Sequence, residues 1–304
     1  MRLFAQYLIA GHNPNQIPIP LNNQPFGFPI TTRDARQPYV YSTLPSCDEL
    51  TVDPQLNLTM EWRKMKECQF SLLQRFFGNP ESVLPNFVSV LYVCDDVSEV
   101  SRIIIKEFLT ARRPYYAALP KCRAETVLLN LGIEEDDSVA QKMKEAVENL
   151  KLYGTSPNGR TSNIYDKVFP IAIAQNDSDV SVITENGEIG RESMKATGLE
   201  KFLKTELNNM KFIDILWINF ENGPFEYWKF VNPDELFDKL GLTLCQIGVE
   251  MRSDQHQNFY AFMLSVLNKR RYIFLKPTTN SDESVVRVIL VNIVNKECYR
   301  KYVL

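Results

Sequence analysis

The side chains best suited to chemistry follow an apolar run at residues 212–218. Asn219, Glu221 and Glu226 stand close together there, in the segment NFENGPFE. A carboxylate can accept a proton as a general base, whereas an asparagine can donate a hydrogen bond but cannot take that proton. Glu221 is therefore the candidate base and Asn219 a candidate partner in binding. A structural role, in which Glu221 caps the next helix or pairs with a basic residue, explains it equally well.

The elements that must position these residues form an alternating series of strands and helices. The run 212–218 is interrupted only by Asp214, which is typical of a parallel strand covered on both faces. Ligands bind outside the carboxyl ends of such strands. Further strands are predicted at 126–131, 151–153, 168–174, 180–184, 242–251, 272–276 and 285–294, and helices at about 137–150, 198–210 and 255–268.

The connection before the last strand is too short to be a parallel crossover, so the final pair is predicted to be antiparallel. A mostly parallel α/β sheet that ends in one antiparallel hairpin is the outline of the class I, Rossmann-like methyltransferase fold. We place this domain at 121–304. Residues 1–55 are rich in proline and asparagine and are predicted to be an extended or disordered arm. Residues 56–120 form an irregular region, with helices expected at 58–77 and 97–110 and a strand at 88–93.

The segment Asn219-Phe220-Glu221-Asn222-Gly223-Pro224, preceded by IDILWI, resembles the fourth-strand motif of FkbM-type methyltransferases, which reads Asp-hydrophobic-Glu-Gly-Ala-Glu. The later segments LGLTLCQIGVEM, RRYIFLKP and VILVNIVNKECYRKYVL are also similar to that family. The resemblance implies S-adenosylmethionine as cofactor and methyl transfer to a hydroxyl group of a small molecule or sugar. Asn219, Asn222 and Pro224 depart from the motif.

The cofactor residues implied by this resemblance follow the first two strands of the domain. Gly132 matches the first glycine of the cofactor loop, and Glu134 stands near a position where a further glycine is usual. Thr155 and Ser156 occupy the place of the carboxylate that usually accepts the ribose hydroxyls. Asp136 could contact the cofactor, although either Asp136 or Asp137 could instead cap the following helix.

Composition excludes several other classes of protein. The chain has 304 residues, a formal net charge of -3 and no long basic run, so we expect no nucleic-acid partner. No apolar run is long enough to span a membrane. The six cysteines are spread singly without metal-site spacing, and we expect no metal.

Cysteines and sequons bear on the compartment. Cys245 is interpreted as a plain core residue, and disulfides among the first four cysteines would need an oxidising compartment. Two sequons occur, at Asn57 and Asn176. The N-terminus is a weak signal peptide, so the cytoplasm is favoured over the secretory pathway.

Two functions therefore remain in view. The first is an S-adenosylmethionine-dependent methyltransferase. The second is a catalytically impaired relative that binds a ligand or a protein through the same cleft. A nicotinamide-dependent oxidoreductase is disfavoured because no GxGxxG follows a predicted strand.

Overall fold

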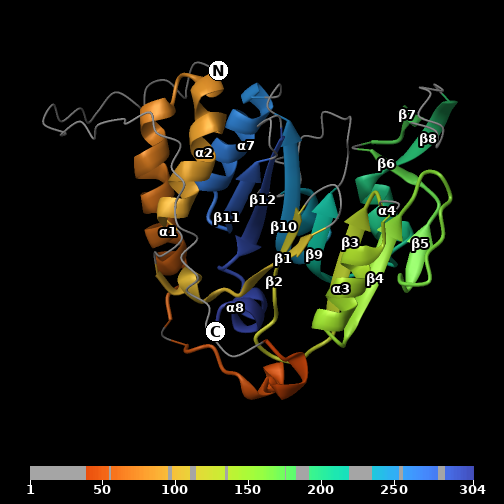
Figure 1. Ribbon diagram of the computed structural model, residues 1–304, viewed down its shortest axis with the longest axis horizontal. Helices are drawn as coiled ribbons and strands as arrows, with labels where there is room; N and C mark the ends of the chain where they lie inside the picture. The colour runs from red at the N-terminus through yellow and green to blue at the C-terminus, as the bar shows by residue number, and fades with distance from the viewer. Residues whose placement is uncertain are drawn as a thin grey trace, which may run out of the picture. The chain divides into compact units, whose positions relative to one another are not determined.

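A computed structural model describes residues 39–54, 56–94, 98–109, 114–133, 136–174, 176–182, 192–218, 235–252, 256–279 and 285–304 (Figure 1). Residues 40–304 form one compact unit. The boundaries predicted near residues 55 and 120 both fall within it.

The main sheet has seven strands in the order β11-β12-β10-β9-β3-β4-β5. They are β3 (Thr126–Leu131), β4 (Leu150–Thr155), β5 (Lys167–Phe169), β9 (Phe212–Ile218), β10 (Thr243–Arg252), β11 (Tyr272–Thr279) and β12 (Val285–Asn292). The strands β5, β4, β3, β9 and β10 are paired in parallel, and β12 runs antiparallel to both of its neighbours. This order, with one inverted strand between β10 and β11, defines the class I methyltransferase fold and confirms the predicted α/β class.

Two smaller sheets accompany the main one. The strands β1 (Ile105–Leu109) and β2 (Pro114–Ala118) form an antiparallel pair. The order β6-β8-β7 joins β6 (Ala172–Ala174), β8 (Glu192–Gly198) and β7 (Ser178–Val182).

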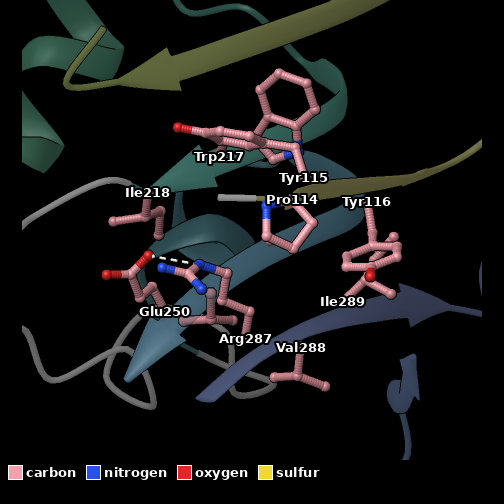
Figure 2. A pocket seen from close by; sticks show the side chains of 11 residues that line it. Pro114, Tyr115, Tyr116, Trp217, Ile218, Glu250, Arg287, Val288 and Ile289 are labelled. Carbon is pink, nitrogen blue, oxygen red and sulfur yellow. Dashed lines mark hydrogen bonds and ion pairs between the residues drawn. The ribbon is translucent and has the colours of Figure 1, made fainter. Parts of the chain in front are cut away.

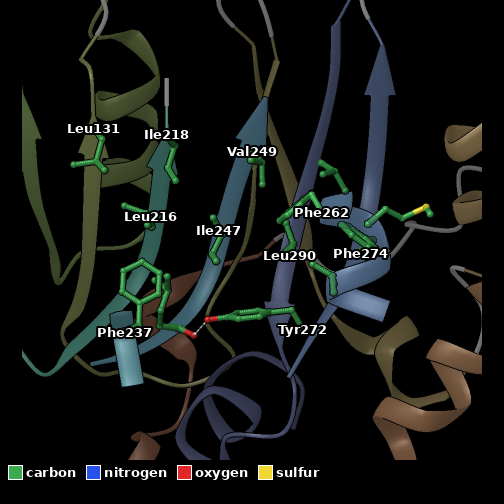
Figure 3. Close-up of a cluster of buried hydrophobic side chains, with 14 of the residues drawn as sticks. Leu131, Leu216, Ile218, Phe237, Ile247, Val249, Phe262, Tyr272, Phe274 and Leu290 are labelled. Atoms are coloured by element: carbon green, nitrogen blue, oxygen red, sulfur yellow. Dashed lines mark hydrogen bonds between the residues drawn. The ribbon is translucent and has the colours of Figure 1, made fainter. Parts of the chain in front are cut away.

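Apolar side chains on one face of the main sheet pack against helices. These helices are α2 (Pro80–Cys94), α4 (Leu199–Thr205), α6 (Leu236–Lys239) and α7 (His256–Asn268). Figure 3 shows Leu216 and Ile247 in this layer, with Phe262 and Phe274 near the β11 end. Because successive side chains of a strand point to opposite faces of the sheet, a second set of side chains lies on the other face.

The opposite face is covered by α8 (Lys296–Tyr302) and by the segment η4 (Ser98–Arg102). The helix α3 (Ser138–Ala146) follows β3, and the short turns η1 (Tyr41–Thr43), η2 (Cys47–Glu49) and η3 (Gln74–Phe76) complete the described helical elements. The helix α1 (Leu58–Leu73) protects the sheet edge: Trp62 Nε1 donates to the Tyr272 carbonyl at 3.1 Å and Gln69 Nε2 to the Phe274 carbonyl at 2.9 Å. Edge strands covered in this way cannot pair with another chain.

The strand predicted at 88–93 is wrong, because these residues belong to α2. Valines suggested a strand, but the buried positions Val83, Phe87, Val90 and Cys94 recur every three or four residues. The helix predicted at 97–110 is also wrong. Within its described part, only the short turn η4 is helical. Residues 105–109 form β1, which begins at Ile105, the last of three consecutive isoleucines, a residue type that favours strands.

Three disulfides join all six cysteines of the chain. They are Cys47–Cys122, Cys68–Cys94 and Cys245–Cys298. The interpretation of Cys245 as a plain core residue is therefore wrong. Cys245 is buried, as expected, but β10 brings it against the start of α8, where Cys298 lies. Sequence spacing could not reveal this pairing because the two residues are 53 positions apart.

An ion pair inside the protein fixes α8 beneath the sheet. Lys301 Nζ lies 2.7 Å from Asp214 Oδ1, and the two residues are 5% and 0% exposed. Asp214 also accepts hydrogen bonds from the Val127 N–H and the Tyr302 hydroxyl, both at 2.8 Å. Burial lowers the pKa of Lys301, and the neighbouring carboxylate opposes that shift. The one polar residue within the 212–218 run is thus a structural anchor.

Candidate functional site

A row of four residues crosses the main sheet near the carboxyl ends of its parallel strands. Gly248 pairs with Trp217, Trp217 with Asn130, and Asn130 with Gly154. Residues paired in register point to the same face of a sheet, so this row forms one continuous surface. It lies at the edge where open α/β sheets bind ligands.

The two glycines make room for larger neighbours in this row. A Cβ atom on Gly248 would lie 2.7 Å from Trp217 Cδ1. One on Gly154 would lie 2.4 Å from Ile133 Cγ2 and 2.9 Å from Tyr165 Cε1. Neither position tolerates a side chain without movement of its neighbours. The indole of Trp217 and the ring of Tyr165 therefore lie close to Gly248 and Gly154, at opposite ends of the row.

A pocket opens beside Trp217 between β2, β9, β10 and β12 (Figure 2). Tyr115 packs on Trp217 with ring centroids 5.0 Å apart. On the β10–β12 side, Arg287 Nε donates to Glu250 Oε2 at 2.9 Å. The pocket combines aromatic surface with a charged pair that has both donors and acceptors, and its volume of about 40 Å³ admits only a small group, since pockets for drug-sized ligands measure roughly 300–1,000 Å³.

The indole N–H of Trp217 is a buried donor without a partner among the described residues. The residue is 3% exposed. A buried donor without a partner costs about 1–3 kcal/mol, so a group that accepts this hydrogen bond would recover part of that energy. Trp217 is as buried as a core aromatic residue, and it also forms part of the pocket wall.

The loop after β3 is tied to the end of β4. Gly132 has φ +87°, a conformation that favours glycine. Its N–H donates to Thr155 Oγ1 at 2.9 Å, and the Ile133 N–H donates to the Thr155 carbonyl at 2.9 Å. Thr155 is 1% exposed. The structure therefore brings Gly132 and Thr155 together, with the threonine hydroxyl bonded to the loop.

The remaining predicted cofactor residues lie around the start of α3 and the loop after β4. Ser156 is buried, and its hydroxyl accepts from the Arg160 N–H at 3.1 Å. Asp136 Oδ1 accepts from the Ser138 N–H at 2.9 Å, and hydrogen bonds from Ser138 hold the pKa of that exposed carboxyl below its usual range. Asp137 instead pairs with Arg160 at 3.1 Å. Of the two aspartates, Asp136 is thus the one whose side chain bonds the first turn of α3.

Three of the predicted site residues lie outside the described residues: Asn219, Glu221 and Glu134. The last described residue of β9, Ile218, lines the pocket beside Trp217. Among the described residues, no group of three or more His, Cys, Asp or Glu side chains is arranged to hold a metal ion. Among the described helices, none combines the length and apolar character needed to cross a membrane.

Sequence reasoning missed three residues of this surface. Asn130 Nδ2 donates to the Tyr165 hydroxyl at 3.0 Å, and burial raises the pKa of Tyr165, which keeps the phenol neutral. Tyr115 belongs to β2, a strand with no clear sequence pattern. An asparagine inside the apolar strand TVLLNL was the only available signal, since buried polar side chains need partners.

Comparison with known proteins finds no matching family model and no matching curated protein. Several solved structures are similar. Fibrillarin in complex with Nop5p is 8% identical with a TM-score of 0.32, over 56% of this chain and 74% of that one. Aeropyrum pernix fibrillarin with natively bound S-adenosyl-L-methionine is 11% identical with a TM-score of 0.30, over 55% and 66%. Geobacter metallireducens precorrin-6y C5,15-methyltransferase is 14% identical with a TM-score of 0.27, over 55% and 80%.

These similarities are too low to support a statement about activity. The fold class rests on the strand order and on the inverted strand β12. The chain has the class I methyltransferase fold.

Proposed function

We propose that the protein is an S-adenosylmethionine-dependent methyltransferase of the FkbM type that methylates a hydroxyl group of a small molecule or sugar. The observation that carries this proposal is the strand order, in which β9 lies beside β3. That neighbourhood brings the ends of β3 and β9, Leu131 and Ile218, to one edge of the sheet. The segment 219–224 that resembles the FkbM motif follows Ile218 directly in the sequence.

The residues at this edge fit the cofactor in part. Gly132 has no side chain to obstruct a ligand, and Asp136 presents an exposed carboxylate of the kind that accepts ribose hydroxyls. We assign Thr155 and Ser156 to holding the loops in place, because their hydroxyls accept hydrogen bonds from the backbone. Glu134 stays a candidate contact. When bound, the cofactor would supply the methyl group of its sulfonium.

The chain's own residues would position the acceptor and take its proton. The reacting hydroxyl group of the acceptor would enter the small pocket beside Trp217, against the indole surface. Glu221 would accept the proton of the reacting hydroxyl group of the acceptor. At the same time, the oxygen of that hydroxyl group would bond the methyl carbon and the bond between this carbon and the sulfur would break. Asn219 would bind through its amide. Holding two reactants in line supplies much of the acceleration in such a displacement.

The second candidate, a binding protein without catalysis, is favoured by one observation. The N–H groups of Gly132 and Ile133 both donate hydrogen bonds to Thr155, so fewer N–H groups of this loop are available to a ligand. A protein that has kept the pocket but lost the cofactor would show this closed arrangement.

Calorimetric titration with S-adenosylmethionine separates the two. We expect micromolar binding that Asp136→Asn weakens about tenfold, as expected for loss of one charge-assisted hydrogen bond. Asp177→Asn is the matched control, because Asp177 is also exposed and also accepts a backbone N–H, at 2.7 Å from Gly198. If no heat of binding is measured at millimolar S-adenosylmethionine, the methyltransferase proposal is refuted and the binding protein without catalysis is the candidate that remains.

Variants at the motif test catalysis once binding is established. Glu221→Gln should abolish methyl transfer to an accepted substrate while cofactor affinity is unchanged. Asn219→Asp should raise the rate. If Glu221→Gln transfers methyl groups as fast as the unmodified protein, Glu221 is not the base.

A further inference from the structure

Every cysteine of the chain is oxidised to a disulfide. All six cysteines are paired, at sequence separations of 75, 26 and 53, and none is free. Each bond forms when two thiols lose two protons and two electrons to a thiol oxidant. Disulfides form and persist in the secretory pathway and in other oxidising compartments, and they are rare in the cytosol. The described residues offer no metal site that would use these cysteines instead.

One of the two sequons is built into the start of α1. Asn57, in Asn57-Leu58-Thr59, is exposed and occupies the N-cap position of this helix. Its Oδ1 accepts from the Met60 N–H at 3.2 Å. Its Nδ2 has no hydrogen-bond partner among the described residues. Because an N-linked sugar is attached to Nδ2, the modified side chain keeps Oδ1 and can still cap the helix.

The position of Asn57 leaves the candidate functional site open. Trp62, one turn into α1, bonds the carbonyl of Tyr272, the first residue of β11. Gln69, further along the helix, bonds the carbonyl of Phe274. The helix α1 therefore runs in the same direction as β11 and begins at the amino edge of the sheet, whereas the pocket lies at the carboxyl edge. A sugar on Asn57 would project from the end of the molecule opposite the pocket.

We propose that Asn57 is an N-glycosylation site and that the protein matures in an oxidising, glycosylating compartment. In the modification, a bond forms between Asn57 Nδ2 and C1 of the first sugar of a lipid-diphosphate-linked oligosaccharide. The bond from that C1 to the diphosphate oxygen breaks, the lipid diphosphate leaves, and Nδ2 loses one proton. This assignment does not depend on the proposed methyltransferase activity.

The second sequon, Asn176-Asp177-Ser178, serves as the internal comparison. Asp177 accepts from the Gly198 N–H and pairs with Lys201 at 3.1 Å, and Ser178 begins β7. The sequon therefore lies where its backbone joins the β6-β8-β7 sheet. We assign the glycan to Asn57 alone.

The test is to secrete the full chain from eukaryotic cells behind a heterologous signal peptide. The product is treated with peptide N-glycosidase, and the Asn57 and Asn176 peptides are analysed by mass spectrometry. We expect one glycan, at Asn57, whose removal converts that residue to aspartate. Asn176→Gln should leave the glycan in place. No glycosidase-sensitive shift, or a glycan on Asn176 alone, would overturn the assignment.

Three variants separate the sugar from the helix cap. Asn57→Gln removes both the acceptor and the cap, whereas Thr59→Ala destroys the sequon and keeps the Asn57 cap. Both should lose the glycan, and Thr59→Ser should retain it. Retention of the sugar in Thr59→Ala would show that it is attached elsewhere.

The oxidised state is tested on the same material. Alkylation of the unfolded protein without reductant should label no cysteine, and reductant should lower the unfolding midpoint by at least about 10 °C for three bonds. Labelled cysteines in the secreted protein, or an unchanged midpoint, would overturn the three disulfides on which the oxidising compartment rests.

Discussion

Separating the buried charges of Asp214 and Lys301 tests how the sheet is anchored to α8. The two groups are 2.7 Å apart and almost fully buried. Removing one partner of such a pair typically costs ~3–5 kcal/mol, because the other charge stays buried alone. We expect Asp214→Asn and Lys301→Met each to lower the free energy of unfolding by this amount near neutral pH. For a domain of this size that is a fall of about 6–20 °C in Tm.

The lowered pKa of Lys301 predicts the pH dependence of the Asp214→Asn variant. Burial lowers the pKa of Lys301 and Asp214 opposes the shift, so Asp214→Asn should lower that pKa further. Where the folded pKa of a lysine is below the unfolded one, the unfolded chain binds more protons between the two values, and stability rises with pH there. The gain is up to about 1.4 kcal/mol per pH unit. The loss caused by Asp214→Asn should therefore shrink above neutral pH.

Urea unfolding of both variants between about pH 5 and pH 9 measures these effects. The exposed pair Lys204–Glu200, at 2.6 Å, provides the control, and Lys204→Met should cost less than about 1 kcal/mol. The double variant Asp214→Asn/Lys301→Met should cost less than the sum of the single variants. The buried pair would be refuted if each single variant cost under ~1 kcal/mol, or if the loss caused by Asp214→Asn did not shrink above neutral pH.

Two further substitutions test the packing described above. Gly248→Ala places a Cβ 2.7 Å from Trp217 Cδ1, so we expect the free energy of unfolding in urea to fall by about 1–3 kcal/mol and any ligand in the pocket to bind more weakly. An unchanged free energy of unfolding would mean that the indole does not lie against this glycine. Replacing Cys68 and Cys94 together by alanine opens a loop of 26 residues, and chain entropy predicts that the free energy of unfolding then falls by about 3.5 kcal/mol. If Tm falls no further than it does for an alanine substitution at an exposed position, the Cys68–Cys94 bond is contradicted.

The central strands could be predicted because each is a continuous apolar run. The predicted bounds of 126–131 and 212–218 agree with those of β3 and β9, and the antiparallel end of the sheet followed from one short connection. The errors arose where tertiary contacts decide the structure. The valines of 88–93 suit a strand in isolation but face a core at helical spacing, and β1 is a strand through its pairing with β2.

The candidate site was less accessible to sequence reasoning. Gly132 and Thr155 were expected near one another, and their hydrogen bond shows that the loop after β3 reaches the end of β4. The pocket, however, depends on Tyr115 and Arg287, which come from elements far from β9 in sequence. Disulfide connectivity is equally non-local, because six cysteines allow many pairings and spacing alone does not select one.

The place of β12 in the sheet has a consequence for the order in which the protein folds. This strand is the last of the described strands along the chain, yet it lies between β10 and β11 and pairs with both. Until residues 285–292 have been synthesised, β11 has no strand partner, and α1 has no completed edge to cover. Pairing between strands that are far apart in the sequence slows folding, because the entropy of closing the loop between them is lost before the favourable contacts form. A nascent chain that ends before Val285 would therefore expose the apolar surface of β10 and β11 and would depend on chaperones for its solubility.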